Sequence, residues 1–246
     1  MNNSRLATAF ITTITISGLA MLGGSLVSLL KTNALHEYQF LALLLLGAVT
    51  SRTKVKLPGI NGTMSVNLPF MMIAAAQLSL FEAVVVALVS AILQSIPKRG
   101  GQFQPVKVLF NASTIVLAAG AAAILLHNGK LVSMHASVAL LAACSIFFLV
   151  NTLPVATIIS LTEGSGMMRI GSSIIHLSFP YYVACTGVTS MVTVVSQRVG
   201  WQGPLAALPV MLLMYRSYQR YFESATKSAR IAPATAKPLA RAAAAN

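Results

Sequence analysis

The acidic residues limit the chemistry that this chain can carry out. There are four glutamates, Glu37, Glu82, Glu163 and Glu223, and no aspartate among 246 residues. This scarcity of acids, and the absence of aspartate above all, removes most metal-assisted, phosphoryl-transfer and paired-carboxylate mechanisms. The chain also has no His-Glu-x-x-His pair and no Gly-x-Ser-x-Gly elbow. We therefore predict that the protein is not an enzyme and has neither a metal site nor a cofactor.

Four polar residues inside apolar stretches are candidate ligand contacts: Asn67, Glu82, Asn111 and His176. Ionisable or amide groups within a membrane span face the interior and often mark function. Three of them have a structural alternative. Glu82 follows Ser79 at the start of a predicted helix, where the helix dipole favours an acid. Asn111 can join two helices by a hydrogen bond, and His176 can be a hydrogen-bonded structural histidine.

The composition is that of an integral membrane protein. The chain is 56% hydrophobic and only 9% charged, whereas roughly a quarter of the residues in soluble domains are charged. The two cysteines, Cys144 and Cys185, lie in apolar runs without metal-ligand or disulfide spacing, and we interpret them as small buried residues. The 17 basic residues are dispersed between apolar runs, so the net charge of +13 does not predict a nucleic-acid partner.

An all-α polytopic fold with about eight hydrophobic segments is predicted from the apolar runs. Residues 1–222 form the predicted helical bundle, and residues 223–246 form a basic tail containing Ala and Pro that we expect to be disordered. The eight segments are 6–30, 38–51, 64–78, 80–97, 105–126, 136–161, 172–196 and 203–222. Eight crossings with both termini in the cytoplasm place 14 of the 17 basic residues inside, as the positive-inside rule favours.

The third segment departs from a plain helix. Residues 53–68 alternate between polar and apolar types around Pro58-Gly-Ile-Asn-Gly62, which is typical of a β-hairpin. Pro69 suits the first turn of a helix, but the apolar run from there to Leu78 is too short to span a bilayer. One interpretation is a broken or re-entrant element with Thr63–Leu68 extended; the alternative is a hairpin at the cytoplasmic interface ahead of one long helix.

The chain resembles the membrane-associated sensor (MASE-type) region that precedes HD-GYP and GGDEF domains in bacterial cyclic-di-GMP signalling proteins. The likeness covers about residues 35–222. The residues that carry it are Lys54–Phe70, Gln77–Ala83, Pro105–Asn111, Asn151-Thr-x-Pro-Val-Ala156, Phe179-Pro-Tyr-Tyr182, Gly200-Trp201, Leu208–Met211 and Tyr215-Arg-Ser-Tyr218.

This resemblance implies a sensor or input module in the bacterial cytoplasmic (inner) membrane. In that family the last helix leads into a catalytic domain, whereas here 28 residues follow Tyr218 and contain no catalytic metal-ligand motif. Any output activity is then expected from a cytoplasmic signalling protein acting in trans. Membrane lipids are the other expected partners, and a homodimer is compatible with this prediction. The alternative function is a small-solute transporter or its membrane binding subunit, similar to those of energy-coupling-factor transporters.

Overall fold

The computed structural model describes residues 2–32, 35–56, 63–97, 102–129, 136–163, 167–217 and 219–221. In these residues the predicted all-α fold is confirmed, apart from two strands of three residues each. The α-helices are α1 (Asn2–Thr32), α2 (Glu37–Thr50), α3 (Leu68–Gln77), α4 (Leu80–Ser95), α5 (Pro105–Leu126), α7 (Ala136–Glu163) and α8 (Met167–Val199). A 3-10 helix, η1 (Gly200–Ala206), follows α8, and residues 207–217 are again helical. The predicted disordered tail, 223–246, lies outside the described residues.

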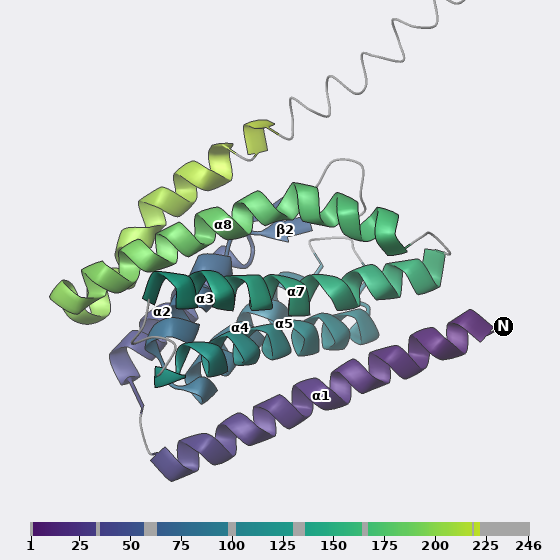
Figure 1. Ribbon diagram of the computed structural model, residues 1–246, viewed down its shortest axis with the longest axis horizontal. Coiled ribbons are helices and arrows are strands. Elements are labelled where there is room, and N and C mark those ends of the chain that lie inside the picture. Colours follow the sequence, from purple (N-terminus) through teal and green to yellow (C-terminus); the bar gives the residue numbers. More distant parts are fainter. Residues whose placement is uncertain are drawn as a thin grey trace, which may run out of the picture.

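Four stretches are long and apolar enough to cross a membrane: Arg5–Thr32, Pro105–Leu126, Ala136–Thr162 and Ser178–Tyr221. The last stretch includes the end of α8, η1 and the final helix. Helices α2, α3 and α4 are apolar but shorter. The chain is therefore polytopic and combines long helices with short apolar ones. Figure 1 shows α7 and α8 lying side by side and α1 along the opposite edge of the bundle.

The predicted hairpin is present, but it is shorter than expected. Strand β1 (Lys54–Lys56) pairs antiparallel with β2 (Thr63–Ser65), with Val55 opposite Met64. One interpretation had Thr63–Leu68 extended, and it was wrong for the last three residues, because Val66 and Asn67 form a turn and the helix begins at Leu68. Pro69 occupies the first turn of α3, where its missing N–H leaves no hydrogen bond unmade.

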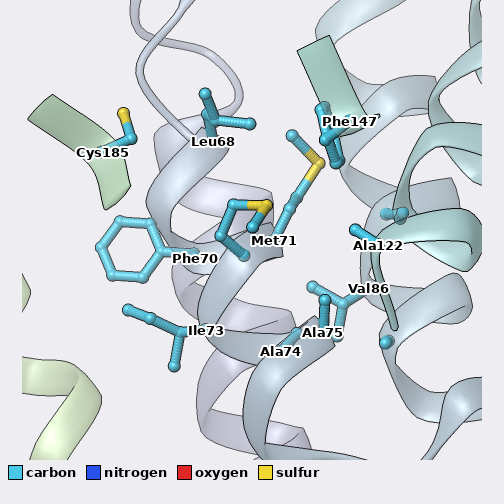
Figure 2. Close-up of a cluster of buried hydrophobic side chains, with 14 of the residues drawn as sticks. Leu68, Phe70, Met71, Ile73, Ala74, Ala75, Val86, Ala122, Phe147 and Cys185 are labelled. Atoms are coloured by element: carbon cyan, nitrogen blue, oxygen red, sulfur yellow. The ribbon is translucent and has the colours of Figure 1, made fainter. Parts of the chain in front are cut away.

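Helix α3 lies in the middle of the core. All eight residues from Leu68 to Ala75 are buried, as expected for a helix that is hydrophobic on every side. It contacts α2, α4, α5 and α8. Figure 2 shows Phe70 and Met71 of α3 among side chains of the surrounding helices, including Phe147 of α7 and Cys185 of α8. Helices α3 and α4 are separate, because the backbone is extended at Leu78 and Ser79.

Helix α1 packs on α5 through small residues. A Cβ added at Gly18 would lie 2.7 Å from the Ser113 Cβ, and one at Gly120 would lie 2.6 Å from the Met21 sulfur. The two backbones therefore approach closely at Gly18, and the Met21 side chain fills the space beside Gly120. Lipid tails are as apolar as helix side chains, so helices in a membrane associate through close packing of this kind and not through the hydrophobic effect.

Candidate functional site

A fully buried carboxylate joins the start of α2 to the start of α4. Glu82 Oε1 accepts a hydrogen bond from the His36 backbone N–H at 2.7 Å. Its Oε2 accepts from the Ser79 N–H at 2.9 Å and the Ser79 hydroxyl at 2.7 Å, and lies 3.1 Å from His36 Nδ1. Ser79 and Glu82 form a capping box, which satisfies the first N–H groups of α4. Glu82 thus has the structural role expected at the start of a helix, and it also binds the backbone of His36.

A second polar chain joins α2, α3 and α8 through the last residue of α3. The Gln39 side-chain amide donates to Gln77 Oε1. Gln77 Nε2 in turn lies 3.5 Å from the Thr193 hydroxyl and 3.3 Å from the Ser196 hydroxyl, near the end of α8. Ser196 is also the point against which Gly203 of η1 packs, since a Cβ at Gly203 would lie 2.7 Å from the Ser196 Cα. The centre of the bundle is therefore linked by side chains to the turn that precedes the final helix.

Asn67 lies at the other end of α3, immediately before its first residue. Its side chain is 1% exposed, and its Nδ2 has no hydrogen-bond partner. Its carbonyl oxygen accepts from the N–H groups of Phe70 at 3.1 Å and Met71 at 3.2 Å, so the backbone is satisfied where the side-chain amide nitrogen is not. Most buried polar atoms have a partner, so a buried donor without one calls for an explanation.

Asn111 and His176 have different surroundings. Asn111 Nδ2 donates to the Ser95 hydroxyl at 2.8 Å, which joins α5 to the last residue of α4, so the expected interhelical bond is observed. His176 is exposed on α8. No hydrogen bond within the described parts of the chain joins His176 to the other three predicted contacts.

The four predicted ligand contacts are therefore not brought together. Asn67 and Glu82 lie at opposite ends of α3, which is about 15 Å long. Asn111 bonds to the last residue of α4, whereas Glu82 lies in the first turn of that helix. Of the four, Asn67 is the one with a buried donor that the protein itself leaves unpaired.

Comparison with known protein families decides the identity of the chain. The MASE9 family model matches residues 24–222. The chain belongs to the MASE9 family. This is a membrane-associated sensor family, so the resemblance seen in the sequence is confirmed. No curated protein and no solved structure matches the chain. Every residue of the two polar chains and Asn67 lies within the matched region.

A further set of polar contacts joins α7 to α8 in this MASE9 chain. The Asn151 side-chain amide donates to the Tyr182 hydroxyl at 3.1 Å, and the Cys144 thiol lies 3.2 Å from the Tyr182 carbonyl oxygen. Cys144 and Cys185 are both buried and unbridged. A cavity of about 10 Å³ opens beside Tyr182. It holds at most one water, so it is not a ligand site.

Five residues of the polar chains were missed in the sequence as site residues: His36, Gln39, Gln77, Thr193 and Ser196. Each lies near the end of an apolar segment, where a polar side chain is ordinary. One signal could have pointed to them: when successive segments cross in alternating directions, the end of one segment lies beside the start of the next. Among the described residues, no group of three His, Cys, Asp or Glu side chains could hold a metal ion.

Proposed function

We propose that this MASE9 chain is a sensor module of the bacterial cytoplasmic membrane that passes a signal from its core to its final helix. The observation that carries the proposal is the side-chain path from Gln77 to Ser196 and on to Gly203. Any displacement of α3 moves the Gln77 side-chain amide. This amide contacts the Ser196 hydroxyl, and Ser196 packs against the turn into the final helix. The family membership supports the sensor role.

The proposed topology has eight crossings with both ends in the cytoplasm. In support, α3 runs antiparallel to α2 and α4 runs parallel to α2, as successive crossings in alternating directions require. The start of α2 bonds to the end of α3, through Gln39 and Gln77. At the other end of the bundle, Arg52 after α2 lies 3.5 Å from the Leu93 carbonyl oxygen, near the end of α4. The distribution of basic residues favours the same arrangement.

The final helix packs on the bundle along one face. Its buried residues Ala207 and Met211 are spaced by four, so one face packs on the bundle and the other is exposed. Toward its end it carries Arg216 and Arg220, both exposed. We propose that this basic end contacts anionic lipid and a cytoplasmic signalling partner, with a second copy of the chain as a further candidate partner.

The proposed signal is a small or lipophilic molecule bound within the bundle. Glu82 and Asn111 already have intramolecular partners that hold helix ends together. A ligand at either residue would have to displace these bonds. At Asn67 a ligand would displace no bond of the side-chain nitrogen, so Asn67 is the favoured ligand contact of the four.

The coupling can be tested by distance measurements between spin labels in nanodiscs. Labels at the exposed positions Leu213, on the final helix, and Met191, on α8, report their separation. We expect Gln77→Leu to shift or broaden the distance distribution, because it removes the bonds to α8. The matched control is Gln104→Leu at an exposed position before α5, which should leave it unchanged. Identical distributions for wild type and Gln77→Leu would refute the coupling.

The sensor role itself requires a response to a molecule. The same labelled protein is measured with and without a bacterial extract of polar lipids and quinones. Wild type should change its distance distribution on addition of the extract, and Gln77→Leu should respond less. The proposal loses its basis if the extract does not change the wild-type distance distribution and Gln77→Leu has the same distribution as wild type.

A further inference from the structure

The unpaired nitrogen of Asn67 is the starting point. An amide nitrogen that loses water on folding and gains no acceptor lowers stability, and a leucine of similar size would avoid this loss. Asn67 is 1% exposed, so bulk water does not supply the acceptor. Nδ2 is a hydrogen-bond donor with no lone pair to accept. The missing partner is therefore an acceptor and not a donor.

The surroundings define the chemistry of that acceptor. Val66 and Leu68, on either side of Asn67, are buried, as are Phe70 and Met71 on the first turn of α3. A charged group here would lose its hydration without a counter-ion among these apolar neighbours, which is costly. A neutral oxygen has a much smaller desolvation cost. The positive end of the α3 dipole also favours the partial negative charge on such an oxygen.

The backbone offers little competition for this oxygen. Pro69 has no N–H, and the N–H groups of Phe70 and Met71 both donate to the Asn67 carbonyl oxygen. The side-chain amide is thus a donor that these groups leave free for an incoming oxygen.

The hairpin next to Asn67 provides a place where the wall can open. Strands β1 and β2 have three residues each and form an isolated two-stranded sheet. Such a sheet is only marginally stable by itself. It is joined to the turn before α3 by the bond from the Val66 N–H to the Thr53 carbonyl oxygen, at 3.2 Å.

We propose that Asn67 Nδ2 donates a hydrogen bond to the neutral carbonyl oxygen of a lipophilic ligand, which enters beside the β1–β2 hairpin. This inference rests on the proposed sensor function, because it names the chemical class of the signal. Ketones, esters and quinones share the recognised oxygen and an apolar body. An apolar molecule without the oxygen lacks the contact that Asn67 provides.

The test compares two probes that differ only in the acceptor: 2-dodecanone and dodecane. Their binding to the full-length protein in detergent is measured by native mass spectrometry. Wild type should prefer the ketone by about tenfold, as one neutral hydrogen bond provides. Asn67→Leu should reduce this preference to about one. The control Asn128→Leu makes the same change at an exposed position and should keep it.

A second measurement needs no variant. With ¹³C-labelled 2-dodecanone, the carbonyl infrared band of ketone bound to wild type should lie at lower frequency than that of ketone in micelles, because a hydrogen bond weakens the C=O bond. An unshifted band, or equal binding of the two probes by wild type, overturns the inference. So does a ketone preference that survives Asn67→Leu; a loss of thermal stability in that variant would then indicate a buried water as the partner of Asn67. The spin-label experiment on Gln77 is independent of these probes, so the coupling can hold when ketone recognition fails.

Discussion

Replacing Glu82 by glutamine tests how strongly the buried carboxylate holds the starts of α2 and α4 together. The change keeps the shape of the side chain but converts one acceptor oxygen into an NH₂ group. If the NH₂ group takes the place of Oε1, the His36 N–H at 2.7 Å loses its acceptor. If it takes the place of Oε2, the Ser79 N–H at 2.9 Å loses its acceptor. In both orientations one backbone donor is left unpaired.

The size of the effect follows from these bonds. A buried donor without an acceptor costs about 1–3 kcal/mol. The remaining bonds to Glu82 also lose their charge assistance, at about 1 kcal/mol each. A neutral amide is easier to bury than a carboxylate, which offsets part of the loss. The expected net destabilisation is about 2–4 kcal/mol, or a fall in the unfolding temperature of roughly 5–15 °C for a chain of this size.

The assay is differential scanning calorimetry of the protein in nanodiscs. The matched control is Glu37→Gln, since Glu37 is also in the first turn of its helix but is exposed. We expect the control to unfold within about 2 °C of wild type. If Glu82→Gln unfolds as close to wild type as the control does, the carboxylate does not hold the two helix starts together, and the reasoning fails.

Two further substitutions address other joints, with the same calorimetric measurement. Gly18→Ala should lower the unfolding temperature by several degrees, because its Cβ would lie 2.8 Å from the Ser113 Cα, whereas Gly23→Ala, with nothing within 4 Å, should raise stability by about 0.5–1 kcal/mol. Equal effects of the two would contradict the close α1–α5 contact. Tyr182→Phe should cost about 1–3 kcal/mol, because Asn151 Nδ2 loses its acceptor between α7 and α8, and an unchanged unfolding temperature would argue against that bond.

The helices were largely predictable because the length of an apolar run decides them. The predicted segment 105–126 coincides with α5, which begins at Pro105, a residue favoured in the first turn. The prediction was less accurate where the backbone changes type. The predicted segment 203–222 begins inside η1, since the chain forms a 3-10 turn over Gly200–Ala206 before the final helix. Apolar character is the same in both conformations and so could not separate them.

The candidate site was predictable only where its partners are near in sequence. Ser79 and Glu82 are three residues apart, and their spacing is that of a capping box. His36 lies 46 residues from Glu82, and Ser196 lies 119 residues from Gln77. These contacts depend on how whole helices pack, and no local period in the sequence encodes them. The unpaired nitrogen of Asn67 is likewise visible only once its neighbours are in place.

The turn η1 also carries Trp201, the only tryptophan of the chain, with about half of its side chain exposed (48%). It lies two residues before Gly203, the position that packs on Ser196. Indole emission depends on the polarity around the ring, so a rearrangement of this turn should change the emission spectrum of the unlabelled protein. The chain thus contains an optical probe at the junction between its core and its final helix.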